Sequence, residues 1–591
     1  MEKARKQVKN FFRVSAEEFS KIPGSPIAYW VNQSVLSAFE KGTPLHKMAH
    51  PRKGMVTADN ERFIRYWVEI AFEKIGFSMN GREQAKKTLS KWFPYTKGGE
   101  FRRWYGNFFW VVNWENDGFE LLNMKKEGYK VGSTNHNLSY IFKPAITWTK
   151  ITSSSSGFRV NFEGFLFDDS SGLCPPAESK DLFLLLGMLN TPISTYLLNV
   201  INPTLNLNPG NLSIIPFIPP LQENPFPERS ISLSKSDWDS FETSWDFTTL
   251  PLLSPTPASW PRETLLSEAY AALRQHWVDA TLEMQRLEEQ NNRIFIDAYG
   301  LEQELSPDVP LEEITLSCNP YYRYGNKVQV EQGSDEKGKT FPFHDELEKR
   351  LRADTVKELV SYAVGCMLGR YSLDRPGLVL ANQGETLDDY LQLVPNPTFP
   401  PDKDNVVPIL EGEWFPDDIV QRFRRFLRLT MGDEHFQQNL EFVEDALGKD
   451  IRKYFLRDFF NDHVTRYKKR PIYWLFSSPK GSFNALVYMH RYRSDTVSVV
   501  LNDYLRPFRA KLAAQLDALQ KQADLSTTSK SGKTRALKEV EKVKAMLKEL
   551  ASYEEKVLYP LATRRVEIDL DDGVKVNYPK LGEALKSVKG L

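Results

Sequence analysis

The sequence predicts an α+β protein, in which a mixed α/β region is followed by a mostly helical C-terminal region with a long helical hairpin. Short apolar runs broken by Gly, Pro and Asn occupy residues 1–235, which is typical of small sheets and short helices. After residue 265 apolar residues recur at spacings of three and four, the period of an amphipathic helix. Near the C-terminus a polar segment that contains Gly532 separates two such stripes, as in an antiparallel helical pair.

The chain of 591 residues is long for one hydrophobic core and indicates three or four domains, at roughly 100 to 200 residues each. Shifts in composition suggest where the boundaries lie. We expect a connector over 1–60, a sheet-containing domain over 61–235, an aromatic linker and a helix over 236–300, a helical domain over 301–410, and a basic helical domain over 411–591 whose hairpin arm spans 503–560.

Within the first region, residues 182–190 followed by 194–198 indicate a short amphipathic helix, and 202–210 indicate a loop. The prolines of 214–220 restrict that segment to an extended edge strand, because proline cannot donate to a sheet ladder. The stretch 221–261 is rich in Pro and Ser and predicts a linker that docks on a partner domain through its aromatic side chains.

Three apolar stripes define the helical region. The first predicts a helix that ends near Tyr299, and further helices are expected over 346–369 and 417–470. The last two stripes flank the polar segment 526–533 and predict a short coiled-coil-like arm. The stripes consist of Leu273, Trp277, Ala280, Met284 and Leu287; of Leu505, Phe508, Leu512, Leu516 and Leu519; and of Leu537, Val540, Val543, Leu547 and Leu550.

The composition is that of a soluble globular protein, and 77 Lys and Arg residues offset 77 Asp and Glu residues. A net charge of zero excludes a histone-like surface but permits a local basic groove, because phosphate binding depends on where the cations lie. Three widely spaced cysteines cannot build a disulfide scaffold or a four-cysteine zinc site, which favours the cytoplasm. The apolar run Leu182–Leu189 is far shorter than the ~20 residues of a membrane helix, so no membrane contact is expected.

No catalytic or metal site is assigned from the sequence. Cofactor sites in doubly wound folds usually begin with glycines two residues apart, but no two of the 32 glycines have that spacing. The tetrapeptide Asn319–Tyr322 is similar to the Asn-Pro-Pro-Tyr loop with which amino-methyltransferases hold a flipped base, but Tyr321 replaces the second proline. We interpret this tetrapeptide as a structural turn and expect the chain to bind no cofactor itself.

Residues 91–114 mix aromatic rings with cations: ten of these 24 residues are aromatic and four are Lys or Arg. Rings stack on bases and cations hold phosphates, so the mixture is typical of a nucleic-acid surface. The alternative is that most of the rings fill a domain core. From this segment we predict DNA contacts by Lys97, Arg102, Arg103, Trp104, Tyr105 and Asn107.

A second basic patch lies between Asn461 and Arg493, where seven cations accompany one carboxylate, Asp462. Phosphate contact is one interpretation and a solvated face is the other. The predicted contacts are Arg466, Lys468, Lys469, Arg470, Lys480 and Arg491, with Asn135, His136, Asn137, Arg159 and Asn161 as candidate readers of base edges.

Several long phrases occur in order along the chain: 22–30, 51–60, 92–99, 101–107, 112–118, 157–159, 205–215, 361–371 and 471–481. Together they resemble the adenine-specific DNA methyltransferases of the BREX phage-defence systems, the PglX family. The resemblance implies that 1–60 is the tail of a methyltransferase domain or a connector, and that 61–235 is a target-recognition domain. Members of that family carry the cofactor glycines and the Asn-Pro-Pro-Tyr loop in an N-terminal domain that this sequence lacks.

The resemblance therefore implies the DNA-binding, target-recognition part of a site-specific adenine methyltransferase, inactive alone, in a bacterial system of phage defence and restriction-modification. Its expected partners are double-stranded DNA, a separate or missing catalytic domain that holds S-adenosylmethionine, and other BREX proteins. An alternative is a helical scaffold that binds other defence proteins through the arm and the aromatic linker. A third is an intact enzyme that uses Asn319–Tyr322.

Overall fold

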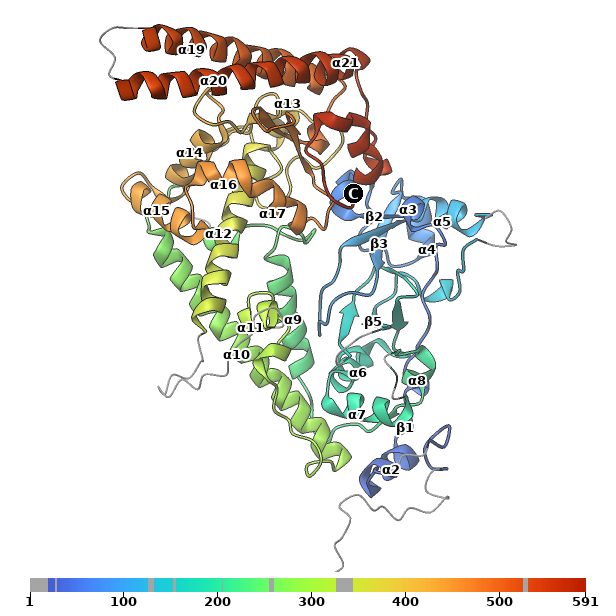
Figure 1. The fold of residues 1–591 in the computed structure, drawn as a ribbon. Coiled ribbons are helices and arrows are strands. Elements are labelled where there is room, and N and C mark those ends of the chain that lie inside the picture. The colour runs from blue at the N-terminus through green and yellow to red at the C-terminus, as the bar shows by residue number, and fades with distance from the viewer. Residues whose placement is uncertain are drawn as a thin grey trace, which may run out of the picture. The chain divides into compact units, whose positions relative to one another are not determined.

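The structure is a computed structural model that describes residues 20–26, 29–125, 132–151, 156–202, 204, 206–254, 260–325, 344–524 and 530–591 (Figure 1). It confirms the α+β class, because small sheets are combined with many helices and the C-terminal region is mostly helical. The chain divides into two compact units. The first unit comprises Met1–Ile64, Lys74–Trp238 and Gln275–Glu336, and the second comprises Arg65–Glu73, Asp239–Arg274 and Lys337–Leu591.

These units cut across the boundaries expected from composition. The long helix α10 (Leu266–Tyr299) starts in the second unit, but most of its residues belong to the first. It ends where the sequence predicts, at Tyr299, and Gly300 follows with φ +62°. The position of α10 could be predicted from the local spacing of its apolar residues. Which unit the helix belongs to could not, because that depends on contacts between distant parts of the chain.

The strands of the first unit form small sheets. β3 (Trp92–Thr96) pairs antiparallel with β4 (Trp110–Asn113) and parallel with β7 (Leu166–Phe167). β5 (Ala145–Thr149) lies between β6 (Phe158–Asn161) and β8 (Ser171–Cys174) and is antiparallel to both. β1 (Thr43–Pro44) pairs only with β9 (Pro216–Phe217), which confirms the edge strand expected within 214–220. The short strand β2 (Ile64–Tyr66) spans the boundary between the units.

Aromatic residues of 91–114 fill the core of the first unit. All five residues of β3 are buried, as in a strand covered on both faces. Phe93 packs against Phe142 at a ring separation of 5.7 Å, and Trp114 belongs to the same cluster. The alternative that most of these rings are core residues is therefore confirmed for the segment as a whole.

The segment expected to be one short helix contains two. α6 (Leu182–Leu189) and α7 (Pro192–Ile201) are separated by a bend of 79°, and Pro192 opens α7 at a position that needs no backbone N–H. Within the described ranges no single helix is long and apolar enough to cross a membrane; this bent pair passes only when both members are counted together.

The expectation of a linker over 221–261 is wrong for its first half, where α9 (Phe226–Asp239) is a helix of 14 residues. Pro227 lies in the first turn, where proline is tolerated, and Ser230 and Ser234 are fully buried small residues. In the second half, the ring of Phe247 lies 5.3 Å from that of Tyr371 in the same unit, so docking on a partner domain stays a prediction.

The remaining helices of the first unit are short. They are α2 (Gln33–Lys41), α3 (Asn60–Phe63), α4 (Arg82–Lys87), α5 (Glu115–Leu122), α8 (Pro209–Ser213) and α11 (Pro320–Tyr324).

The second unit is mostly helical and contains a three-stranded antiparallel sheet that the sequence did not predict. Its central strand β12 (Asn484–Tyr488) pairs with β10 (Val406–Pro408) and β11 (Tyr473–Ser477). The helices expected over 346–369 and 417–470 are confirmed as α12 (Asp345–Met367), α14 (Ile419–Met431), α15 (Phe436–Leu447), α16 (Ile451–Arg457) and α17 (Phe459–Arg466). Shorter helices are α13 (Leu387–Leu393), α18 (Thr496–Val499), α21 (Tyr559–Arg564) and α22 (Val574–Asn577).

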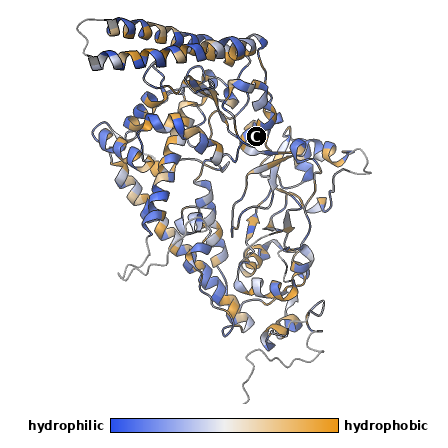
Figure 2. Ribbon diagram, in the orientation of Figure 1, coloured by the Kyte–Doolittle hydropathy of each residue, from blue (hydrophilic) through white to orange (hydrophobic). Residues whose placement is uncertain are grey.

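The hairpin arm is confirmed. α19 (Arg506–Asp524) and α20 (Lys530–Tyr553) lie side by side (Figure 1), while residues 525–529 of the expected turn lie outside the described residues. Leu512, Val540 and Val543 are buried, in agreement with the apolar stripes, but Leu537, the first member of the second stripe, is exposed. Hydrophilic residues run along both helices between these apolar positions (Figure 2).

Candidate nucleic-acid interface

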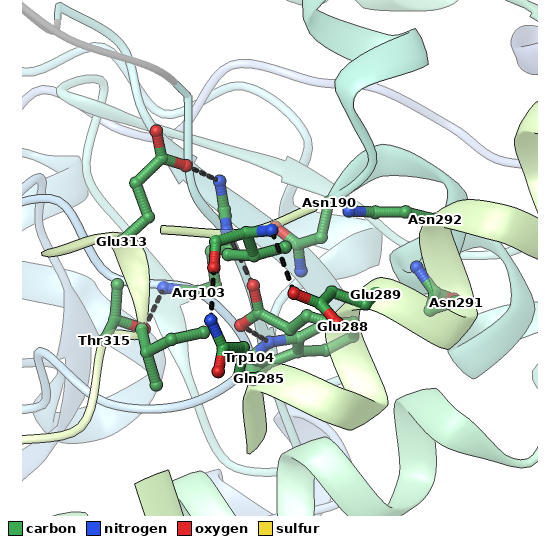
Figure 3. Close-up of polar contacts among 12 residues, drawn as sticks. Arg103, Trp104, Asn190, Gln285, Glu288, Glu289, Asn291, Asn292, Glu313 and Thr315 are labelled. Carbon is green, nitrogen blue, oxygen red and sulfur yellow. Dashed lines mark hydrogen bonds and ion pairs between the residues drawn. The ribbon is translucent and has the colours of Figure 1, made fainter. Parts of the chain in front are cut away.

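Arg103, a predicted DNA contact, lies inside the first unit in a network of polar contacts with α10 (Figure 3). Its Nη1 atom is 2.7 Å from Oε2 of Glu288, and its Nη2 atom is 2.6 Å from Oε2 of Glu313. The indole Nε1 of Trp104 donates to the other oxygen of Glu288 at 2.7 Å. The backbone N–H of Arg103 donates to Oγ1 of Thr315 at 3.0 Å, so the whole residue is held in place.

Electrostatics match this burial. Burial raises the pKa of the Glu288 carboxyl, and the neighbouring Arg103 opposes that rise. Burial lowers the pKa of the Arg103 guanidinium, but Glu288 and Glu313 more than compensate, so it stays charged. A buried pair of this kind is tolerated only when both partners are present.

Arg102 and Arg159 are also interior residues. Arg102 lies 3.5 Å from Oδ2 of Asp237, and its guanidinium lies 5.0 Å from the ring centre of Trp238. Arg159 donates only a long bond of 3.4 Å to the carbonyl oxygen of Arg102. Burial, followed by repulsion from Arg102, lowers the pKa of Arg159 to about 10.

These positions correct the expected role of the cationic loop. Arg102, Arg103, Trp104, Tyr105, Asn107 and Arg159 are all buried in the first unit, so in this fold their side chains are not placed to touch a duplex. Asn107, for example, donates to the carbonyl oxygen of Glu100 at 2.9 Å. Local sequence could not reveal this, because the carboxylates that accept from Arg103 are 185 and 210 residues away.

The second basic patch contains two kinds of cation: arginines that bind partners within the second unit, and exposed lysines. Arg466 pairs with Glu242 at 2.6 Å, Arg470 lies 3.5 Å from Glu69, and Arg491 donates to the carbonyl oxygen of Asp402 at 2.9 Å. Arg491 is buried, which corrects its expected role, whereas Arg466 and Arg470 are half-buried and their predicted DNA contacts stay predictions. Lys468, Lys469 and Lys480 are exposed, and their predicted DNA contacts stay predictions.

Asn319 has a structural role. Its side-chain oxygen accepts from the N–H of Tyr321 at 3.1 Å and so caps α11, while its Nδ2 donates to the carbonyl oxygens of Leu311 and Ile314 at 2.8 and 2.9 Å. Both halves of the amide are therefore engaged inside the fold, as expected for a turn. Within the described ranges, no group of three or more His, Cys, Asp and Glu residues is arranged to hold a metal ion.

One predicted cation, Lys97, lines a pocket of about 550 Å³ in the first unit. Its Nζ lies 3.2 Å from Oδ2 of Asp168, which also accepts from the hydroxyl of Tyr95 at 2.9 Å. On the same pocket, Lys150 pairs with Asp169 at 2.8 Å. The other lining residues are Met55, Val56, Thr57, Asn60, Gly98, Thr149, Ile151 and Ser170.

Next to the pocket in sequence lies a basic cluster that sequence reasoning missed. Arg52 and Lys143 lie 5.5 and 5.9 Å from the ring centre of Tyr140. Lys53 and Lys143 are exposed, and among the described residues neither of them, nor Arg52, forms an ion pair. We call Arg52, Lys53, Asn137, Tyr140 and Lys143 the Tyr140 cluster. The basic pair Arg52–Lys53 is a weak sequence signal, because only the fold brings Lys143 to it.

The fold also brings the predicted reader loop to this cluster. Asn137 donates from Nδ2 to the carbonyl oxygen of Lys53 at 3.1 Å, and Val56, which lines the pocket, forms a β-bridge with Thr134. Asn135 is half-buried and donates to Oγ of Ser133 at 2.6 Å, whereas His136 is exposed. Asn161, the remaining candidate reader, is fully buried and is thereby corrected to a core residue, which donates to Oγ1 of Thr96.

The sequence-based interpretation missed one match to a known motif, the phosphate-binding P-loop. Residues 333–340 read Gly-Ser-Asp-Glu-Lys-Gly-Lys-Thr and fit the pattern GxxxxGK[ST] of phosphate-binding P-loops. That pattern is meaningful only between a strand and a helix, and these residues lie outside the described part of the chain. We assign no role to the match.

Comparisons with known proteins support the sequence resemblance. No family model matches the chain. The chain is 35 % identical over 594 residues to the adenine-specific methyltransferase BrxX of Escherichia coli O9:H4 (strain HS), an alignment that covers 97 % of this chain and 46 % of that protein. It is 35 % identical over 587 residues to the adenine-specific methyltransferase PglX of Lacticaseibacillus casei (strain Zhang), covering 96 % and 45 %. The chain is homologous to both and spans just under half the length of each.

Proposed function

We propose that this chain is the DNA-contacting, target-reading part of an adenine-specific DNA methyltransferase, and that the methyl donor is bound by a catalytic domain outside this sequence. The observation that carries the proposal is the homology: 97 % of this chain aligns with a protein named as an adenine-specific methyltransferase. The lack of any two glycines two residues apart supports the second half of the proposal, because donor sites of this class usually use them.

The Tyr140 cluster is the surface that we propose for DNA contact. Lys53 and Lys143 are exposed cations without an ion pair among the described residues, so no internal carboxylate competes with a phosphate for them. The ring centre of Tyr140 lies 5.5 Å from Arg52 and 5.9 Å from Lys143, and an aromatic ring beside cations is typical of nucleic-acid surfaces. In the adjacent pocket Lys97 and Lys150 are each paired with a carboxylate, so the unpaired lysines of the Tyr140 cluster carry the proposed phosphate contact.

We further propose that the loop Asn135–Asn137 reads base edges. Asn side chains recognise adenine through paired hydrogen bonds in the major groove, and exposed His136 is placed beside two asparagines. Phosphate contacts of the neighbouring lysines would fix the register of that loop on the duplex.

The proposed partners follow from the same assignment. They are double-stranded DNA, the methyltransferase catalytic domain that holds S-adenosylmethionine, and other proteins of a BREX-like phage-defence system in the bacterial cytoplasm. The full protein would methylate adenine at its recognition site, whereas this chain alone would bind DNA without transferring a methyl group.

Duplex binding by the full chain, measured by fluorescence anisotropy over a series of salt concentrations, tests the proposal. The affinity should fall with salt, by a slope of about −0.9 in log K per phosphate contact. The variant K53Q/K143Q should reduce that slope by about 1.8. Lys180→Gln provides a matched control, because Lys180 is an exposed cation of the same unit that is paired with Glu178 at 2.7 Å. Affinity that is weak and independent of salt would contradict the proposal.

A further inference from the structure

The helix α20 of the hairpin arm carries a local excess of positive charge. Between Lys530 and Lys548 the sequence contains seven Lys and Arg residues and two Glu residues, although the whole chain has a net charge of zero. The whole helix, Lys530–Tyr553, also contains Glu549 and therefore carries a surplus of four positive charges, which is a property of the arm and not of the protein as a whole.

Packing within the arm directs these cations outward. Ala536, Val540, Val543 and Leu550 are buried, and their spacing places them on the side of α20 that contacts α19. Arg535, Lys538 and Lys548 are exposed, and their positions in the sequence place them on the other sides of the helix.

Most of this charge is not neutralised internally. Lys542 pairs with Glu411 at 2.9 Å and Lys544 pairs with Glu541 at 3.0 Å. Within the described ranges, Arg535, Lys538 and Lys548 form no ion pair, and neither does half-buried Lys533. Like charges held on one helix repel one another, so an anionic partner would lower the free energy of this surface.

The spacing of the free cations fits a linear array of negative charge. From Arg535 to Lys548 the helix rises about 20 Å at 1.5 Å per residue. Phosphates of one DNA strand follow one another every 3.4 Å along the axis, so this length spans roughly six base pairs. An acidic protein would offer carboxylates in patches, whereas a duplex offers a continuous row at this scale.

We infer that the outer face of α20 binds the phosphate backbone of double-stranded DNA, as an electrostatic contact separate from the Tyr140 cluster. The inference rests on the proposed function, because it assumes that the chain binds DNA. It assigns that binding to a second surface, α20 of the second unit, whereas the Tyr140 cluster belongs to the first. Contacts of this kind add affinity without reading sequence.

The test is the salt dependence of duplex binding by the full-length triple variant R535Q/K538Q/K548Q. Glutamine keeps helix propensity, so unfolding temperature should be unchanged. The salt slope should fall by about 2.7, at 0.9 for each of three contacts, equally on duplexes with different sequences. The matched variant E539Q/E541Q removes two carboxylates from the same helix and should bind DNA more tightly.

Each outcome is decisive. If the parent chain binds DNA with a steep salt slope and the triple variant keeps that slope, the inference is wrong while the proposed function stands. If the triple variant keeps DNA binding but loses binding to poly-glutamate, the arm is a site for acidic proteins and the inference is again wrong. If the parent chain binds no duplex, the proposed function fails and the inference fails with it. Loss of slope in the triple variant and in K53Q/K143Q separately supports two independent contacts.

Discussion

The guanidinium of Arg103 lies 2.7 Å from a carboxylate oxygen of Glu288, and both side chains are enclosed in the first unit, 10 % and 3 % exposed. This pair joins the loop after β3 to the helix α10, and Trp104 donates to the same carboxylate. A residue whose sequence context predicts a phosphate contact is thus an interior residue that ties the loop after β3 to α10.

Arg103→Met is expected to destabilise the protein by about 3–5 kcal/mol, because Glu288 and Glu313 would remain buried with no cation. The double variant R103M/E288Q should recover part of that loss. Thermal unfolding followed by circular dichroism measures both. If R103M unfolds at the same temperature as the parent but binds DNA more weakly, Arg103 is an exposed DNA contact and the prediction is wrong.

Arg159→Met is expected to leave stability unchanged or to raise it, by about 1 kcal/mol or more. The Nε and Nη2 atoms of Arg159 have no hydrogen-bond partner among the described residues, and burial with repulsion from Arg102 lowers its pKa to about 10. Its charge therefore opposes folding at neutral pH. Unfolding temperature and duplex affinity should be measured on the same preparation, since a large loss of sequence preference at normal stability would mark Arg159 as a base reader.

Asp404→Asn is expected to flatten part of the pH dependence of stability in the second unit. Burial, followed by repulsion from Asp402, raises the pKa of Asp404 to about 7, and its oxygens accept from the hydroxyl of Tyr504 at 3.1 Å. Because the pKa of Asp404 is higher in the folded state than in the unfolded state, its contribution to the free energy of unfolding is fully present below pH 3.8, near the pKa in the unfolded chain. That contribution is lost as the pH rises towards 7.

The measurement is the difference in unfolding temperature between the parent and D404N at pH 5, 6.5 and 8. The free energy of unfolding of D404N should rise relative to that of the parent as the pH increases from 5 to 8. The change in this difference should be at least about 1 kcal/mol. Burial lowers the pKa of His490 to about 3, so this residue makes the protein more stable as the pH rises, opposite to Asp404. The effect of His490 is the same in both proteins and cancels when D404N is compared with the parent. A difference that is constant over this range would mean that Asp404 titrates at its ordinary value.

Asn319→Ala is expected to cost about 1–3 kcal/mol, because the carbonyl oxygens of Leu311 and Ile314 would lose a buried donor. It should leave duplex binding intact. Photocrosslinking with tritiated S-adenosylmethionine, applied to the parent chain and to N319A, should label neither. Labelling of the parent chain that disappears in N319A would identify Asn319 as part of a donor or target pocket.

Much of the helical architecture was predictable because it depends on local periodicity. The stripe through Trp277 and Met284 located α10, and the stripes through Leu512 and Val543 located the arm. The helix α9 was missed, because its prolines and serines indicate a linker unless their burial is known. The three-stranded sheet of the second unit was missed too, since β10 is more than sixty residues from its partner strand.

The candidate site was less predictable than the fold. From the segment 91–114 DNA contacts were predicted; Lys97 lines a pocket, and its DNA contact stays a prediction, but the neighbouring Arg102 and Arg103 are buried. The Tyr140 cluster was missed because Lys53 and Lys143 are ninety residues apart and neither stands in a dense basic segment.

The sequence by itself determined the α+β class, the positions of the long helices and the relationship to adenine-specific methyltransferases, since periodicity and shared phrases are properties of the chain read in order. Only the tertiary structure decided which cations face solvent. An arginine is free or buried according to the carboxylate that the fold brings to it, and for Arg103 that carboxylate is Glu288, 185 residues along the chain.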